Sequence, residues 1–455
     1  MKKKLISLFL VFVFFLTAGA GCKKPTMQEA VKPVVLNFWR VYEGQDAFAE
    51  IIAKYNAQHP YVTINYRKLR YDEYEEALLN AFAEDRGPDI FSIHNTWIRK
   101  YESKLEPMPA QTTMVFPITQ GSLKKEVVPE FRTMKSLGLK ELKQNFVDAV
   151  YSDVVLNDKI YGLPLSVDTL AMYYNQDLFD QAGITEIPRY WNRDFQQMVK
   201  KLTKQDLKGN ILQSGVALGG GKNIERYSDI LAILMMQNGA SMMSDAGQVL
   251  FQTVPAVFQS QNYNPGLMAL RFYTDFANPI KEVYCWNSGL ENSVDLFASG
   301  KLAIMFGYSY HLPTIKTKAP KLNFLVEPIP QIEGATVPTN MANYWVEAVS
   351  KKSLYKNEAW NFIQFMTSSE NATSYLEKTN KPTALRSLIN TQKEDPEIGV
   401  FADQVLTAKS WYRGKNPILA ENFLADMIQA VLADTENKTI ELMNFYANRI
   451  QQTVN

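Results

Sequence analysis

Short apolar strands alternate with amphipathic helices over residues 34–93, and this alternation limits the fold more than any other feature of the chain. Strands are expected at residues 34–39, 62–66 and 89–93, with one amphipathic helix in each interval. Strands that alternate with helices of this length form a parallel sheet covered on both faces. The sequence therefore predicts an α/β fold.

The first 22 residues have the layout of a secretory signal. Three lysines at positions 2–4 precede an apolar run from Leu5 to Leu16, and small residues at 17–21 lead to Cys22. The apolar run is too short to cross the ~30 Å hydrocarbon core of a bilayer. This segment is therefore expected to direct export rather than to span the membrane.

Cys22 follows the small residues as the cysteine does in the lipobox of bacterial lipoproteins, which this segment resembles, although Gly19 stands where that motif usually has Leu. The resemblance implies a signal peptide at residues 1–21 and a lipidated N-terminus with a tether at residues 22–33. Two acyl chains on Cys22 would hold the chain stably on a membrane. The alternative is an ordinary secretory signal followed by a chance cysteine.

Cysteine content, length and charge narrow the remaining possibilities. Cys22 and Cys285 are the two cysteines, so acylation of the first leaves no disulfide partner, and a large core must hold the fold. Cleavage before Cys22 leaves 455 − 21 = 434 residues, enough for two domains. The formal net charge of +1 gives no electrostatic basis for nucleic-acid binding. Residues 107–144 lack a clear period and are interpreted as an insertion or an irregular helical excursion.

Four stretches, in the right order along nearly the whole mature chain, resemble the family 1 extracellular solute-binding proteins, which include many sugar carriers. They are the opening strand and helix at 36–60 together with Gly87–Ile90, the segment Ile160–Phe179, the segment Phe297–Met305, and Ala348–Ser353 with the helix after it. The segment Ile160–Phe179 is the most specific of the four.

The resemblance implies a two-lobed α/β fold of the periplasmic-binding-protein type II kind, in which each lobe is a mostly parallel sheet flanked by helices. By analogy, the N-terminal lobe comprises residues 34–165 plus 303–345, and the C-terminal lobe comprises residues 166–302 plus 346–455. The chain is expected to cross between lobes near Leu165, Ala303 and Val346, with the ligand in the cleft between them.

Physical chemistry indicates which side chains could line that cleft. Ligands of open α/β sheets bind beyond the carboxyl ends of the strands. A sugar ring presents an apolar C–H face to aromatic rings and hydroxyl groups to polar side chains. Core packing is the alternative for about half of the candidates, because large aromatic residues are often buried. The aromatic candidates, led by Trp286 and Trp345, are Tyr42, Trp97, Tyr173, Trp191, Trp286, Tyr308, Tyr344, Trp345 and Trp411, and the polar candidates are Glu43, Gln45, Asn95, Asp168 and Arg413.

Signatures of catalysis are weak. The three histidines show no metal-ligand spacing, and the run Gly219–Lys222 fails the phosphate-loop pattern because Asn223 follows the lysine. No enzyme activity, cofactor or metal is therefore expected.

The resemblance implies the substrate-binding component of an ABC importer, which binds a mono- or oligosaccharide and delivers it to the transmembrane subunits of a permease. We expect a monomer held by its lipid on the cell membrane, on the extracellular or periplasmic side. The alternative is a surface lipoprotein that acts as a carbohydrate hydrolase or adhesin without transport.

Overall fold

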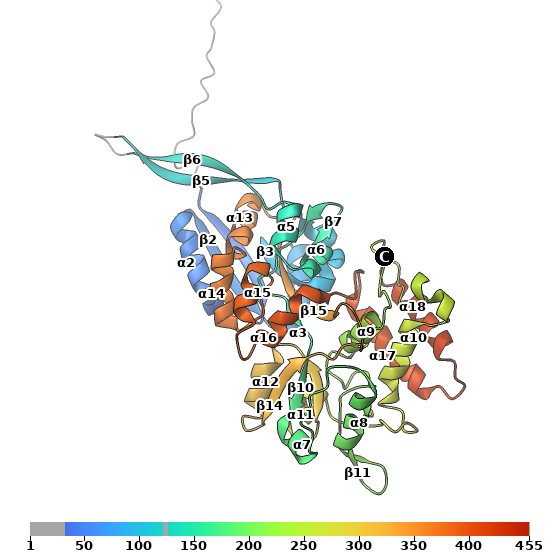
Figure 1. Cartoon of the computed structure of the whole chain (residues 1–455). Coiled ribbons are helices and arrows are strands. Elements are labelled where there is room, and N and C mark those ends of the chain that lie inside the picture. The colour runs from blue at the N-terminus through green and yellow to red at the C-terminus, as the bar shows by residue number, and fades with distance from the viewer. Residues whose placement is uncertain (1–31, 122–125, 455) are drawn as a thin grey trace, which may run out of the picture.

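The computed structural model describes residues 32–121 and 126–454, so the predicted signal peptide and most of the predicted tether lie outside the described residues. The described chain forms two lobes, each with its own hydrophobic core (Figure 1). Among these residues, none of the helices is both long and apolar enough to cross a membrane.

The first lobe is built on a five-stranded sheet in the order β2-β1-β3-β16-β4. The strands are β1 (Val34–Val41), β2 (Val62–Leu69), β3 (Ile90–His94), β4 (Leu105–Glu106) and β16 (Trp345–Ser350). Strand β1 is parallel to β2 and β3, and β16 is antiparallel to β3 and β4. The predicted strand–helix alternation over residues 34–93 is confirmed, since α2 (Ala49–Gln58) and α3 (Tyr71–Ala83) occupy its two intervals.

Further short elements complete the first lobe. A small antiparallel pair is formed by β7 and β8. Their bounds and those of the remaining helices are α4 (Ile98–Tyr101), α5 (Leu139–Asn145), α6 (Asp148–Val154), β7 (Val155–Leu156), β8 (Lys159–Ile160), α13 (Lys356–Met366), α14 (Ser369–Thr379) and α15 (Arg386–Gln392), with 3-10 turns η1 (Gln45–Ala47), η2 (Asn95–Trp97) and η3 (Glu102–Lys104).

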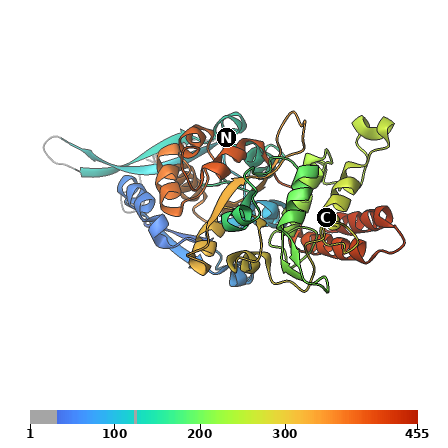
Figure 2. The same cartoon turned by 60° about the horizontal axis from the view of Figure 1, so that its bottom comes forward.

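A long β-ribbon stands out from the first lobe (Figures 1 and 2). It consists of β5 (Gln111–Gln120) and β6 (Glu126–Lys135), paired antiparallel in continuous register. Residues 107–144 are therefore mainly a ribbon followed by α5, and the irregular helical excursion suggested by the sequence is wrong. Cross-strand pairing is a contact between distant residues, and local periodicity does not report it.

The second lobe contains a three-stranded antiparallel sheet in the order β13-β10-β14 and a β11–β12 hairpin. Apolar helices surround this sheet, and α9 lies almost wholly in the core. The bounds are β10 (Ala171–Asn175), α7 (Gln176–Gln181), α8 (Arg193–Leu202), β11 (Lys204–Gln205), β12 (Ile211–Gln213), α9 (Tyr227–Gln237), η4 (Ala256–Gln261), α10 (Pro265–Asp275), α11 (Ser293–Ala298), β13 (Ile304–Gly307), α12 (His311–Lys318), β14 (Phe324–Pro328), α16 (Gly399–Gln404), η5 (Val405–Thr407), α17 (Pro417–Ala433) and α18 (Thr439–Gln451). A mostly parallel sheet was expected in both lobes. It is found between β1, β2 and β3 of the first lobe, whereas the three-stranded sheet of the second lobe is antiparallel.

A third small sheet joins the lobes. It has the order β17-β15-β9, formed by β9 (Asp168–Thr169), β15 (Asn340–Asn343) and β17 (Ala408–Lys409). Within β15, Met341 packs in the core of the second lobe and Ala342 in that of the first. These strands therefore form the hinge. The first crossover was expected near Leu165, and the chain passes from the first core to the second at β9, a few residues later.

The later crossovers differ from the prediction. Residues 303–345 were expected in the first lobe, but β13 pairs with β10 and the chain stays in the second core as far as Ile329. Residues from 346 onward were expected in the second lobe, but β16 pairs with β3, and Val346–Ile389 packs in the first core. The chain rejoins the second core around α16, and the region Trp411–Val454 lies there as expected. Strand partners hundreds of residues apart decided these assignments, and the local sequence pattern does not encode them.

Candidate functional site

The first wall of the candidate site between the lobes forms where strands of the first lobe end. Tyr42 directly follows β1, and His94 is the last residue of β3. Trp345 begins the antiparallel β16 opposite His94, so it lies at the same edge of the sheet. Tyr42 has a left-handed backbone with φ 69°, which is a strained conformation for a bulky residue. Strained backbone conformations of this kind are concentrated at functional sites.

Trp345 lies at the centre of a group of aromatic rings and is partly exposed. Its ring centroid lies 5.8 Å from Tyr42 and 6.2 Å from Tyr71, both in edge-to-face geometry. Tyr42 and Tyr71 stack on each other at 5.9 Å and are about half exposed. The remaining ring neighbours, at 5.6 to 6.0 Å, are Tyr74, His94 and Trp97. These neighbours fix the orientation of Trp345 while leaving aromatic surface open.

The second wall is organised by Asp229 in the first turn of α9. Its Oδ2 accepts hydrogen bonds from Arg226 Nε at 2.9 Å and from the Tyr308 hydroxyl at 2.6 Å. Its Oδ1 accepts from Trp411 Nε1 at 3.1 Å. Arg226 also lies 3.4 Å from Glu421 of α17 and has a left-handed backbone, φ 57°. One buried carboxylate therefore positions a cation, a phenol and an indole contributed by three separate segments.

Aromatic surface is present on the second wall as well. Tyr310 stacks on Tyr308 with centroids 5.7 Å apart and is 41% exposed. Tyr308 itself is fully buried. Tyr310 therefore presents a ring supported from behind, as Trp345 does on the first wall.

The two walls lie close enough for the charges of one to act on the other. Burial lowers the pKa of His94 to about 4, with Arg226 acting in the same direction and Asp229 opposing it. Burial raises the pKa of Tyr42, together with Tyr71 and Glu43, while Arg226 of the opposite wall opposes the rise. At neutral pH His94 is therefore uncharged, and Arg226 carries the positive charge between the walls.

A buried ionic cluster supports the loop after β1. Arg40 lies 3.4 Å from Glu43 and 3.2 Å from Glu347, and Lys381 also pairs with Glu43. Burial disfavours ionisation of Glu43, but Arg40 and Lys381 lower its pKa below the ordinary value. Glu43 therefore forms ion pairs with Arg40 and Lys381, and these pairs hold the loop that carries Tyr42. Gln45, in η1, is exposed.

Three of the predicted polar and aromatic candidates meet at the hinge instead. Asp153 Oδ2 accepts hydrogen bonds from Tyr344 at 2.7 Å and from Asn95 at 3.3 Å. Arg413 lies 3.7 Å from Asp153 and 3.1 Å from Asp245, so it joins the two lobes. Burial raises the pKa of Asp153, and Arg413 opposes that effect. Two neighbouring cavities of about 480 and 300 Å³ share Asp245 and Arg413 in their linings.

Asp168, another candidate, fastens the hinge to the second lobe. Its carboxylate accepts hydrogen bonds from the backbone N–H of Ser309 at 2.9 Å and from its hydroxyl at 2.7 Å. Burial raises the pKa of Asp168 to about 6, against the effect of these hydrogen bonds.

The structure places the other candidates in the two cores. Trp286 is fully buried and donates Nε1 to Asn223, so it offers no surface to the cleft. Tyr173 is also fully buried, and Trp191 packs against the ring of Phe195. Trp97 is nearly buried beneath Trp345. These aromatic residues fill core volume because their neighbours in space, rather than their positions near strand ends, determine their exposure.

Sequence reasoning missed six residues of the two walls. One local signal was present, since Arg226 and Asp229 are spaced i, i+3 across the start of a helix, where such pairs meet. Tyr71, His94 and Tyr310 carried a second signal, since each lies at or shortly after the carboxyl end of a strand, but they were not chosen as candidates. Glu421 gave no local signal, because its helix reaches the site from a distant part of the chain. The six residues are Tyr71, His94, Arg226, Asp229, Tyr310 and Glu421.

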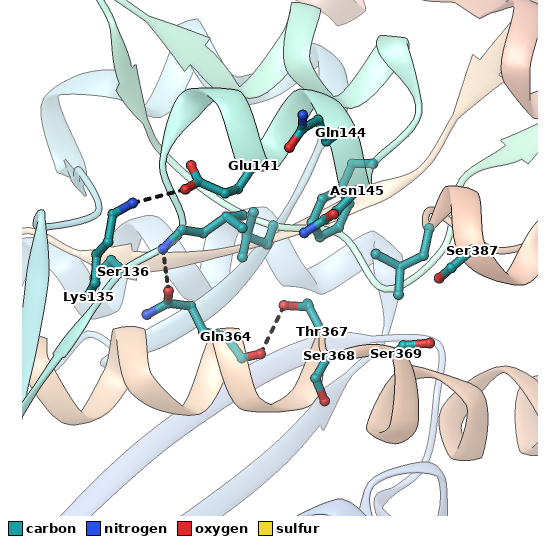
Figure 3. A pocket seen from close by; sticks show the side chains of 14 residues that line it. Lys135, Ser136, Glu141, Gln144, Asn145, Gln364, Thr367, Ser368, Ser369 and Ser387 are labelled. Atoms are coloured by element: carbon teal, nitrogen blue, oxygen red, sulfur yellow. Dashed lines mark hydrogen bonds and ion pairs between the residues drawn. The ribbon is translucent and has the colours of Figure 1, made fainter.

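A separate cavity of about 590 Å³ lies wholly within the first lobe, between α5, α13 and α15 (Figure 3). Gln364 on its wall is already engaged, since its Oε1 accepts from the backbone N–H of Leu137 at 2.8 Å. Residues of the second lobe do not line this cavity, so it is distinct from the inter-lobe cleft. Over residues 32–121 and 126–454, no group of three or more His, Cys, Asp or Glu side chains is arranged to hold a metal.

Comparisons with known proteins agree with this architecture. The sequence profile described as "Bacterial extracellular solute-binding protein" matches residues 43–373. The galactooligosaccharide-binding protein of Bacillus subtilis is 20% identical over 438 residues, covering 92% of this chain and 89% of that protein. A cyclo/maltodextrin-binding protein complexed with maltotetraose superposes with a TM-score of 0.69 at 16% identity, covering 92% of this chain and 97% of that one. An ABC transporter solute-binding protein of Thermotoga lettingae bound with α-D-tagatose gives 0.66 at 17% identity, covering 93% and 100%. The two-lobed fold and the family resemblance are confirmed.

Proposed function

Because this chain belongs to the family of bacterial extracellular solute-binding proteins, we propose that it is the substrate-binding component of an ABC importer and that its solute is a mono- or oligosaccharide. The relatives named for galactooligosaccharide binding and for multiple-sugar binding support the carbohydrate assignment. So do the structural neighbours with maltotetraose and tagatose bound. The permease is the partner that such a protein requires.

The observation that carries this proposal is the pairing of Trp345 on one wall with Tyr310 and the Arg226–Asp229 pair on the other. A sugar ring placed between them would lay its C–H face on a supported aromatic ring. Its hydroxyl oxygens would face the guanidinium of Arg226, which donates charge-assisted hydrogen bonds and is held in place by Asp229. Each wall comes from a different lobe, so the complete site exists when the lobes are closed.

Closure over the ligand follows from this division of the site. A ligand that touches both walls binds the closed form more tightly than the open one and shifts the equilibrium toward closure. The hinge strands β9, β15 and β17 are short, and a few residues are enough to absorb such a rotation. Members of the family bind solutes, so we assign this chain a binding role and no catalytic step. Release of product from a supplied oligosaccharide would instead support the hydrolase alternative.

Thermal denaturation across a carbohydrate library tests the proposal, because a ligand that binds the folded form alone raises the melting temperature. For a hit, Trp345→Ala should weaken binding by about 2 kcal/mol, roughly thirty-fold. Phe445→Ala removes an exposed aromatic ring from α18, in the second lobe, and should leave affinity unchanged. Stabilisation by amino acids or polyamines and by none of the carbohydrates would show that the assigned solute class is wrong. Equal affinities of the two variants would show that the assigned wall is wrong.

We further propose that the chain acts as a monomer anchored to the outer side of the cell membrane through acylated Cys22. The signal-like segment before Cys22 supports this anchor. In a bacterial host, a palmitate analogue should label the wild-type chain, whereas Cys22→Ser should remain unlabelled and leave the membrane fraction. An unlabelled wild-type chain would contradict the anchor.

A further inference from the structure

The far end of the β5–β6 ribbon is an apolar structure that the body of the first lobe leaves uncovered. We define the distal ribbon as residues 115–120 of β5 and 126–131 of β6, which face one another in the register. Phe131 is 56% exposed and Val127 is 47% exposed. Its ionisable residues are Glu126 and Glu130, and its eight apolar residues are Val115, Phe116, Pro117, Ile118, Val127, Val128, Pro129 and Phe131.

The ribbon is attached to the lobe along one edge and then leaves it. The backbone N–H groups of Thr113 and Val115 point outward from β5, toward Asn357 at 3.4 Å and the Tyr61 hydroxyl at 3.1 Å. Two residues further on, the same edge reaches Pro117, which has no N–H to donate. The hydrogen-bonded attachment therefore ends at Val115. Phe116 also packs on His59, with ring centroids 5.0 Å apart, and the ribbon projects beyond these contacts (Figures 1 and 2).

One face of the distal ribbon carries the exposed apolar side chains of Phe131 and Val127. The cross-strand pairs Val115–Phe131, Pro117–Pro129 and Thr119–Val127 share this face, because residues directly opposite in a ladder point the same way. The opposite face turns toward the lobe at its base, where Met114 is buried. An isolated two-stranded ribbon is marginally stable in water, and exposed apolar patches of this kind mark interaction surfaces.

A second copy of the chain is a poor fit as the occupant of this surface. Strand addition needs outward-pointing N–H groups along an edge. Pro117 and Pro129 lie directly opposite each other, so each edge of the ribbon lacks a donor at the same level. The occupant should therefore satisfy apolar side chains without requiring backbone hydrogen bonds, and hydrocarbon has that property.

The path of the chain places the start of the lipid-bearing segment, and with it the hydrocarbon of the membrane, near the distal ribbon. Val34 N–H, at the start of β1, donates to the Tyr61 carbonyl at 2.8 Å, and the Tyr61 hydroxyl holds Val115 at the root of the distal ribbon. The segment that leads back to Cys22 thus joins the described chain beside the ribbon. The eleven residues between Cys22 and Val34 can span at most about 40 Å. The ribbon from Val115 to Gln120 extends roughly 17 Å, less than half of that reach.

We propose that the distal ribbon inserts its apolar face into the surface of the lipid bilayer that carries the chain's own lipid anchor, and so orients the first lobe on the membrane. This inference rests on the proposed anchoring at Cys22. The anchor supplies proximity, and the ribbon supplies a second, non-covalent contact that restricts rotation. The permease is the competing occupant, and the test distinguishes it.

Single-cysteine labelling suits this chain, because Cys285 is buried and Cys22 is consumed by acylation. Phe131→Cys carries an environment-sensitive fluorophore on the exposed face of the ribbon. The matched control is Leu207→Cys, a fully exposed leucine in the β11–β12 hairpin of the second lobe. The acylated full-length variants are reconstituted without permease into vesicles of phosphatidylcholine and phosphatidylglycerol, and flotation confirms anchoring.

The label at position 131 should shift its emission to shorter wavelength, lose accessibility to aqueous iodide, and be quenched severalfold more by nitroxide-bearing lipids than the label at 207. Equal iodide accessibility of the label at 131 with and without vesicles would overturn the proposal. Protection that requires added permease would also overturn it and assign the ribbon to that partner. Protection that grows with protein concentration in the absence of lipid would assign it to a second copy.

A parallel arm separates this inference from the anchoring proposal. The mature chain with Cys22→Ser and an N-terminal hexahistidine tag is held on vesicles by nickel-chelating lipid, which supplies the tether without acylation. Shielding of position 131 in this arm, together with failure of Cys22 to be acylated, would sustain the ribbon contact and refute the anchor. Exposure of position 131 in both arms would refute the ribbon contact while leaving the anchor and solute binding unaffected.

Discussion

Asp229 gives the sharpest test of how the second wall of the cleft is built. Its carboxylate is 3% exposed and accepts hydrogen bonds from Arg226, Tyr308 and Trp411. Asp229→Asn keeps the size of the side chain and removes its charge. The amide keeps one acceptor oxygen, and its NH2 group would face either the Arg226 and Tyr308 donors or the Trp411 donor. The substitution therefore addresses the hydrogen-bonding pattern rather than the packing volume.

The expected loss of stability can be worked from these contacts. Removing one partner of a buried ion pair costs about 3–5 kcal/mol, because the remaining charge is left unpaired. Arg226 keeps Glu421 at 3.4 Å, and its side chain is 20% exposed, so the lower end of that range applies. A loss of about 3 kcal/mol in a lobe of roughly 200 residues lowers the melting temperature by about 6–12 °C. Ligand affinity should fall at least tenfold, about 1.4 kcal/mol, since Arg226 and Tyr308 lose their common anchor.

Denaturant unfolding followed by tryptophan fluorescence measures the stability, and calorimetric titration with a ligand from the library measures the affinity. Asp426→Asn is the matched control, because Asp426 is an exposed residue of the nearby α17 and undergoes the same change of charge. If Asp229→Asn unfolds at the same denaturant concentration as Asp426→Asn, the assignment of Asp229 as the organiser of this wall is refuted.

Three further predictions follow from the same geometry. Trp286→Ala should cost about 3–5 kcal/mol of unfolding free energy while the folded fraction binds ligand normally, because Trp286 is fully buried; weaker binding at unchanged stability would contradict its core position. Burial lowers the pKa of His311 to about 4, so its contribution to stability is present above pH 6.5 and declines as pH falls toward 4, by about 2 kcal/mol at pH 5. Asp168 has a raised pKa, so its effect on stability changes with pH in the opposite sense. Comparing the wild type with His311→Gln isolates the contribution of His311, and equal slopes of unfolding free energy against pH in the two proteins would refute that contribution. Small-angle X-ray scattering should show a smaller radius of gyration at saturating ligand, and an unchanged radius would argue against lobe closure.

Much of the first lobe could be predicted from sequence because its opening elements are local. The strands β1, β2 and β3 pair with near neighbours along the chain, and the helices between them carry regular apolar faces. The antiparallel sheet of the second lobe and the ribbon could not be predicted in this way. In both, pairing partners are chosen by long-range contacts, and an apolar segment such as Ile304–Gly307 fits a buried strand in either lobe.

The candidate site was predicted in part for a similar reason. Tyr42 was expected near the cleft because it follows a predicted strand, and Trp345 because it lies at an expected crossover between the lobes. The structure brings the two rings together at 5.8 Å. Trp286, in a loop before an expected helix, and Tyr173 were also candidates, yet both lie in the core of the second lobe. Whether a residue at a strand end faces a cleft or a core depends on what packs over it, and that covering comes from distant segments.

The sequence by itself determined the α/β class, the two-lobed family pattern and an aromatic contribution to the cleft, because these depend on periodicity and on short motifs. The tertiary structure alone decided which lobe holds residues 303–345 and which holds 346–389, and it alone assembled the second wall. Asp229 contacts Arg226 three residues away, and this contact can be predicted from sequence because residues spaced i, i+3 are neighbours on a helix. It meets Tyr308 and Trp411 across 79 and 182 residues. Contacts at such separations depend on the packing of the whole lobe, and no local pattern in the chain specifies them.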